Sequence, residues 1–191
     1  MMLLAKRFLV GAGIFLAGCS MPSLSKQGIA PPVISPCVVA DQNLSPKEKE
    51  AIAELRRNVE SGPFYTTPAS AAGIAKCTAG YEAGVIALEY TFRDGGWLRV
   101  KRDPRIEYND QEARFELPPG QDPTAVLKRA ELAAFGTNGC GIDWGESEKQ
   151  PAEDDPQAVE TIFRGDTCNC QARIRTNAAG RAVGFRLRST C

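Results

Sequence analysis

The stretch that decides the fold is residues 84–117, GVIALEYTFRDGGWLRVKRDPRIEYNDQEARFEL. Apolar and polar side chains alternate along it with a period of two, the period of a strand that buries one face. Residues that favour turns (Asp, Gly, Pro and Asn) interrupt the alternation. The stretch therefore predicts four antiparallel strands in a meander.

The register of this meander follows from its turns. A three-residue loop over residues 94–96 would place Phe92 opposite Leu98 on one face. A shift by one residue would mix apolar with charged side chains on that face, so the pattern selects this register. Further turns around residues 103–104 and over residues 109–112 would complete the four strands.

A helix is predicted on each side of the meander. Ser45-Pro46-Lys47-Glu48 has the spacing of a capping box, and Gly62 marks the end of the first helix. Asp122 and Pro123 begin the second helix, which Gly136 ends. The second helix is expected to cover the apolar side of the meander. The apolar stripes are Ile52, Leu55 and Val59 in the first helix, and Val126, Leu127, Ala130, Ala133 and Ala134 in the second.

Two segments lack these patterns and are interpreted as loops. Residues 63–80 are rich in Pro, Thr, Ser, Gly and Ala and are expected to connect the first helix to the meander. Residues 143–160 carry seven acids and one lysine, a net charge of −6, and are expected to form an exposed acidic loop. A carboxylate pair that cleaves glycans would have to lie here beside Trp144, but solvated carboxylates are the favoured interpretation. The carboxylates in question are Asp143, Glu146 and Glu148.

The C-terminal hairpin has one apolar and one basic face if residues 177–180 form its turn. The apolar face carries Ala172, Ile174, Val183, Phe185 and Leu187, and the same alternation places Cys168, Cys170 and Cys191 on it. The outer face carries Arg173, Arg175, Arg186 and Arg188. Guanidinium groups at this density can bind phosphate or carboxylate ligands. The acidic segment 143–160 could instead neutralise them, so both readings stay open.

The cysteines indicate three disulfides. Of seven cysteines, Cys19 is assigned below to a lipid anchor, which leaves an even set of six. Cys168 and Cys170 would lie about 7 Å apart in an extended strand, so each is expected to bond a different segment. A metal site is the alternative, but the chain has no histidine and no C-x-x-C pair. The six candidates, whose pairing stays open, are Cys37, Cys77, Cys140, Cys168, Cys170 and Cys191.

The N-terminal leader predicts export. Lys6 and Arg7 precede a nine-residue apolar run over residues 8–16, whereas a membrane-spanning helix needs about twenty apolar residues. Leu16-Ala17-Gly18-Cys19 then resembles the lipobox of bacterial lipoprotein precursors. The resemblance implies that Cys19 receives a diacylglyceryl group, that the chain is cut before it, and that the new amino terminus is acylated with a fatty acid such as palmitate. Ser20, where an Asp would favour the inner membrane, implies the outer membrane.

Charge and motifs exclude several classes of function. Removal of residues 1–18 leaves 21 basic and 23 acidic residues, a formal charge of −2, which argues against nucleic-acid binding. Without histidine there is no Ser-His-Asp or Cys-His arrangement, and the nucleotide-binding glycine motifs are missing from the sequence. The protein is therefore predicted not to be an enzyme and to need no cofactor or metal.

These features predict an α+β domain, a mainly antiparallel meander and C-terminal hairpin with two helices, stabilised by disulfides. Residues 1–18 are assigned to a lipoprotein signal peptide, 19–36 to a flexible tether and 37–191 to the single domain. The order of helix and strands suggests two helix-plus-sheet units, although no residue-level repeat supports this. The predicted function is that of a lipid-anchored, periplasm-facing envelope protein with a structural role or a protein partner. The alternative is a binder of lipopolysaccharide or peptidoglycan that uses the four arginines.

Overall fold

The computed structural model describes residues 37–39, 43–136 and 140–191 of the 191-residue chain. The predicted signal peptide and tether lie outside the described residues, as does the lipobox with Cys19. No helix in the described part of the chain is long and apolar enough to cross a membrane.

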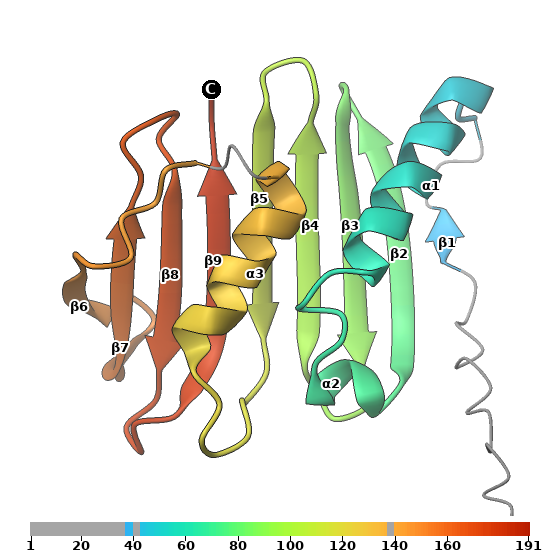
Figure 1. Cartoon of the computed structure of the whole chain (residues 1–191). Coiled ribbons are helices and arrows are strands. Elements are labelled where there is room, and N and C mark those ends of the chain that lie inside the picture. Colours follow the sequence, from blue (N-terminus) through green and yellow to red (C-terminus); the bar gives the residue numbers. More distant parts are fainter. Residues whose placement is uncertain (1–36, 40–42, 137–139) are drawn as a thin grey trace, which may run out of the picture. The chain divides into compact units, whose positions relative to one another are not determined.

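A nine-stranded sheet forms the body of the protein, in the order β1-β2-β3-β4-β5-β9-β8-β7-β6 (Figure 1). All neighbouring strands from β2 to β6 in this order pair antiparallel, and the two-residue β1 pairs parallel with β2. The mainly antiparallel sheet is therefore confirmed. The strands are Val38–Val39 (β1), Ile74–Glu82 (β2), Val85–Phe92 (β3), Trp97–Asp103 (β4), Tyr108–Arg114 (β5), Glu148–Ala152 (β6), Asp155–Arg164 (β7), Gln171–Thr176 (β8) and Ala182–Ser189 (β9).

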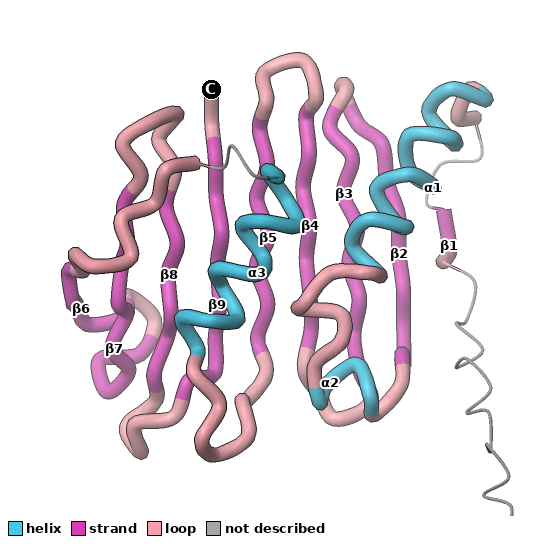
Figure 2. The backbone as a smooth tube through the Cα atoms, in the orientation of Figure 1, coloured by secondary structure: helices cyan, strands magenta, loops and turns pink. Residues whose placement is uncertain are grey.

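The three described helices lie on the same face of this sheet (Figures 1 and 2). They are α1 (Pro46–Glu60), α2 (Pro68–Ala71) and α3 (Pro123–Phe135). The fold is mostly β, so the α+β class holds only in outline, with a small helical share. Because the described helices all cover one face, no helix of the described residues lies on the other face of the sheet, which we call the open face.

The strand order divides the sheet into two similar halves. Strands β2 to β5 form one antiparallel meander after α1 and α2, and β6 to β9 form a second after α3. The last strands of the two halves, β5 and β9, pair antiparallel at the centre. The topology therefore agrees with two helix-plus-sheet units, although the sequence shows no residue-level repeat.

Both predicted helices are confirmed, with the caps that the sequence indicated. The backbone N–H of Ser45 donates to the Glu48 carboxylate at 2.7 Å, and the Ser45 hydroxyl accepts from the Glu48 N–H at 3.3 Å. The Asp122 carboxylate accepts from the Thr124 N–H at 2.9 Å. These bonds satisfy N–H groups that have no partner inside the first turn of a helix.

The meander prediction is correct for the faces of β3 and β4 and wrong in its number of strands. It is also wrong for Tyr108, which the alternation places on the apolar face but which pairs with Asp103 on the open face. The first hairpin loop covers residues 93–95, so Tyr90 rather than Phe92 pairs with Leu98. This change of two positions keeps every side chain of β3 and β4 on its predicted face. Residues 104–107 form the next turn, and residues 109–112 lie inside β5, so residues 84–117 contain three strands instead of four.

Both segments that were interpreted as loops contain strands. Residues 63–80 form α2 and most of β2, whose buried side chains, Cys77 and Ala79, are too small to give a strong apolar signal. Residues 143–160 form β6 and the first part of β7. Four of the seven acids that suggested a loop pair with arginines: Glu148 with Arg164, Asp154 and Asp155 with Arg175, and Glu160 with Arg173. Long-range charge pairing of this kind overrides local propensity.

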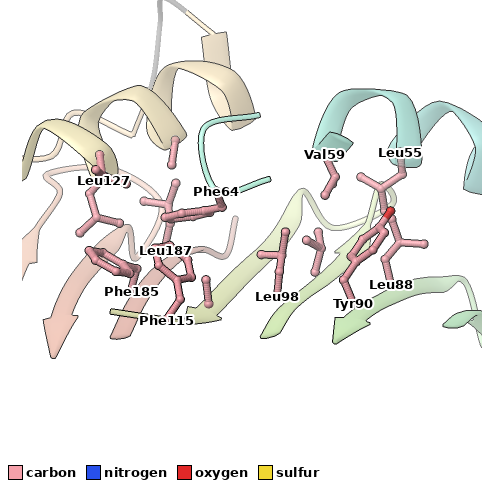
Figure 3. Packing of buried hydrophobic residues seen from close by; sticks show 14 of the residues in the cluster. Leu55, Val59, Phe64, Leu88, Tyr90, Leu98, Phe115, Leu127, Phe185 and Leu187 are labelled. Carbon is pink, nitrogen blue, oxygen red and sulfur yellow. The ribbon is translucent and has the colours of Figure 1, made fainter. Parts of the chain in front are cut away.

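The apolar core lies between the sheet and the helices (Figure 3). Helix α1 packs on β2 and β3, and α3 packs on β9 and β8, so α3 does not lie mainly on the first meander as expected. Phe185 is 2% exposed and stacks on Phe115, with ring centroids 5.0 Å apart. Phe64, in the connection after α1, lies 6.0 Å from Phe185 and joins the two halves of the core. Of the second predicted stripe, Ala133 is exposed.

Candidate functional site

The six cysteines of the described region form three pairs at disulfide distance. Their Cα–Cα separations are 4.6 Å, 5.5 Å and 4.6 Å. As predicted, Cys168 and Cys170 join different segments. The bridges tie β1 to β2, the loop after α3 to the start of β8, and the C-terminus to the turn before β8. The pairs are Cys37–Cys77, Cys140–Cys170 and Cys168–Cys191.

The prediction that three C-terminal cysteines point into the core is correct only for Cys170, which is 3% exposed. Cys168 and Cys191 are exposed. Cys168 and Asn169 have φ values of +54° and +42°, so they form a turn rather than the extended strand on which the alternation argument depended. The Cys168–Cys191 bridge therefore lies at the surface.

The arginines of the C-terminal hairpin lie on the open face, as predicted. Arg173 and Arg186 are directly paired across β8 and β9, and Arg175 pairs with Gly184. Arg175 is buried at 9% exposure beneath the turn between β6 and β7. Its guanidinium lies 2.5 Å from the Asp154 carboxylate and 3.6 Å from that of Asp155.

Arg173 and Arg186 also have carboxylate partners. Arg173 donates to Glu160 at 3.1 Å. Arg186 forms a bidentate pair with Asp110, with N–O distances of 3.0 Å and 2.7 Å. The hydrogen bond to Asp110 is the main reason that the pKa of Arg186 is raised. Arg188 differs from them: it is exposed, and its guanidinium carbon lies 5.8 Å from the centre of the Tyr108 ring.

The acidic segment thus neutralises much of the basic face. It supplies Asp154, Asp155 and Glu160 to the hairpin arginines. The hydrogen bond from Arg175 is the main cause that lowers the pKa of Asp154. Of the two interpretations that the sequence left open, the geometry favours neutralisation by this segment for Arg173 and Arg175. Arg186 is neutralised as well, but by Asp110 of β5.

The open face also presents a tryptophan that the sequence reasoning did not single out. Trp97, on β4, is partly exposed. The guanidinium carbons of Arg99 and Arg114 lie 5.2 Å and 5.9 Å from its ring centre, within the range of cation–π contacts. Arg99 is in turn bonded to Glu89 at 2.8 Å. The alternation in β4 placed Trp97 outside, but the proximity of Arg114 depends on the register of β5, which was predicted wrongly.

The carboxylates that were considered for glycan cleavage line one shallow hollow. Asp143, Glu146 and Glu148 lie around it with Arg164, which pairs with Glu148 at 3.0 Å. Trp144 packs on Phe163, and its indole N–H donates to Glu131 on α3 at 3.1 Å. Trp144 therefore anchors its loop to α3 and to the core. The hollow thus brings the three predicted carboxylates together. Besides them, its described lining consists of Ser147, Ile162 and Arg164.

Comparison with known proteins gives no information on the function of this chain. No protein-family model, curated protein or solved structure matches the chain. The function is therefore inferred from the described residues and from the leader sequence.

Proposed function

We propose that this is a lipid-anchored envelope protein that faces the periplasm and binds another protein through the open face of its sheet. Cys19, in the lipobox-like Leu16–Cys19 stretch, would carry the anchor. The three disulfide-distance pairs support the exported location, because disulfides persist in oxidising compartments. The membrane is thus one partner, through the lipid, and an envelope protein the other.

The observation that carries the proposal is the arrangement around Trp97. Tryptophan, tyrosine and arginine are the residues most enriched where binding energy concentrates in protein interfaces. The open face presents Trp97 beside Arg99 and Arg114, and Tyr108 beneath Arg188. These planar groups stand on adjacent strands of a hydrogen-bonded sheet, so little conformational entropy would be lost when a partner binds.

Charge favours a protein over a simple anion as the partner. Arg99, Arg173 and Arg186 each have a carboxylate within 3.1 Å, so a phosphate group would have to displace that carboxylate. The surface of a folded protein carries both positive and negative groups. Along the rim of an interface, such groups can contact the carboxylate and the arginine of each ion pair. The ion pairs thus weigh against lipopolysaccharide or peptidoglycan as the ligand of Arg173, Arg175 and Arg186.

Photo-crosslinking in cells tests the proposal. A photoreactive amino acid at Thr91, the exposed cross-strand neighbour of Trp97, should give a crosslink to one specific envelope protein. The same amino acid at Leu132, which is 58% exposed on α3, serves as the control on the helical side. The crosslink from Thr91 should disappear when Trp97→Ala is added. If Thr91 and Leu132 give the same products, the open face is not the binding surface.

A further inference from the structure

A cleft between α1 and α3 lies on the helical side of the sheet, opposite the open face. It is open to solvent on one side and is lined by residues of α1, α3, β4 and β5. Leu98 forms part of its floor on β4, and Val59 of α1 and Phe64 contribute to its walls. Figure 3 shows these three side chains in the region between the two helices. One side of the cleft is therefore apolar.

The other side of the cleft is polar, although it belongs to the face of the sheet that is otherwise apolar. Arg102 on β4 and Asn109 on β5 are cross-strand neighbours, and Gln111 follows two residues along β5. Asn58 adds a further carboxamide from α1. Asn109 is buried at 8% exposure, where a polar group costs free energy unless it is hydrogen-bonded. Its one described side-chain bond accepts from Gln111 at a long 3.4 Å.

Arg102 differs from the arginines of the open face. Among the residues that the structure describes, none forms an ion pair or hydrogen bond with its side chain. It is also the only charged residue among those described as lining the cleft, where no carboxylate balances it. The cleft thus combines a recessed, unneutralised guanidinium with carboxamide N–H groups, which are all hydrogen-bond donors.

We propose that this cleft binds a small molecule or chain end that carries one carboxylate and a short apolar group. A carboxylate offers two oxygens at the spacing of two guanidinium N–H groups, so Arg102 can bind it in bidentate geometry. The Asn58 and Asn109 amides can donate to the same carboxylate or to a neighbouring carbonyl. The apolar group would lie against Leu98, Val59 and Phe64. A free short-chain acid and the C-terminus of a peptide share this chemistry.

This site is independent of the proposed function, because it lies across the sheet from Trp97 and shares no lining residue with the open face. Its test is an NMR titration of the ¹⁵N-labelled full-length chain, kept in solution with a non-ionic detergent. The ligands are butyrate and N-acetyl-alanyl-alanine, each compared with its uncharged amide. Butyrate or the peptide should shift the amide signals of cleft residues in a saturable way, and the matching amides should not.

Variants separate the site from general charge effects. Arg102→Gln should weaken carboxylate binding by about tenfold or more, since it removes a charge-assisted bidentate contact. Arg129→Gln is the matched control: Arg129 is exposed on α3 and the same charge is removed, so binding should be unchanged. Ala133→Phe, at an exposed position that lines the cleft, should block binding by filling it without disturbing the core.

The outcomes decide the proposal. Tighter binding of butyrate assigns the site to free acids, and tighter binding of the peptide assigns it to chain ends. Absence of saturable shifts at cleft residues with both ligands overturns the proposal. Equal binding of acid and amide, or unchanged binding in both Arg102→Gln and Ala133→Phe, overturns it as well.

Discussion

Removal of one oxygen atom from Tyr90 tests how α1 is held on the sheet. The Tyr90 side chain is 1% exposed, and its hydroxyl donates to the Glu60 carboxylate at 3.0 Å. Glu60 also accepts from Arg56 at 3.0 Å, so its charge keeps a partner when the hydroxyl is removed. A hydrogen bond to a charged group contributes about 1.5–3 kcal/mol. Because Arg56 remains, Tyr90→Phe should lower the free energy of unfolding by about 1.5 kcal/mol at pH 7.

The same variant should behave differently in alkali. Burial, followed by the negative charge of Glu60, raises the pKa of Tyr90 above its ordinary value of 10. Between pH 10 and the raised pKa, the unfolded chain loses the tyrosine proton while the folded chain keeps it, so the stability of the parent protein falls as pH rises. At pH 11 this loss amounts to about 1.4 kcal/mol for one proton. It is absent from Tyr90→Phe, so the two proteins should have nearly equal stability there.

Urea unfolding at pH 7 and pH 11, followed by circular dichroism with any free thiol alkylated beforehand, measures both values. The parent should be the more stable protein at pH 7, and the difference should vanish near pH 11. A difference that stays constant between the two pH values would refute the reasoning, because Tyr90 would then titrate equally in both states. Equal stability at pH 7 would mean that the bond to Glu60 does not hold α1 in place.

Three further predictions concern the bridges, the anchor and a turn. Cys191→Ser should lower the free energy of unfolding by about 2–4 kcal/mol in urea titrations and should leave Cys168, which is exposed, reactive toward Ellman's reagent. Cys19→Ala should move the protein from the membrane fraction to the soluble fraction without changing its circular dichroism spectrum; a variant that stays with the membrane would contradict the lipid anchor. Gly84→Ala should lower the melting temperature by an amount equivalent to about 1 kcal/mol or more, because Gly84 has φ +94° and an added Cβ would meet the Arg105 guanidinium. An unchanged melting temperature would show that the turn tolerates a side chain.

Local signals in the sequence were sufficient for the helices and for the C-terminal hairpin. The Ser45 capping box and the Asp122 cap depend on neighbours in the chain, so they could be read directly. The common apolar face of Ile174 and Phe185 followed from the alternation in both strands and from one clear turn, although the irregularity next to Thr176, which sets their direct pairing, was not predicted. Predictions of this kind succeed because the interacting residues are close in sequence.

Partners distant in sequence explain what was missed. Asp110 looks like part of a loop, but its carboxylate is held by Arg186, which is 76 residues away, so it lies within a strand. Asp154 and Asp155 lie at the turn of the β6–β7 hairpin, where both pair with Arg175 on β8. The Arg102 cleft was not predicted either, since it forms only where α1 and α3 lie apart on the sheet. The signal in the sequence that could have drawn attention to it is Arg102 itself, which follows Leu98 and Val100 on the apolar side of the alternation in β4.

The most direct test of the central claim is the affinity of the protein for the partner captured from Thr91. Trp97→Ala should weaken binding by about thirtyfold or more, since a tryptophan at the centre of an interface contributes about 2 kcal/mol or more. Leu132→Ala, which removes an exposed apolar side chain from the helical side, should leave the dissociation constant unchanged. Equal affinities of Trp97→Ala and the parent protein, with both equally folded, would contradict the claim that the open face binds a protein.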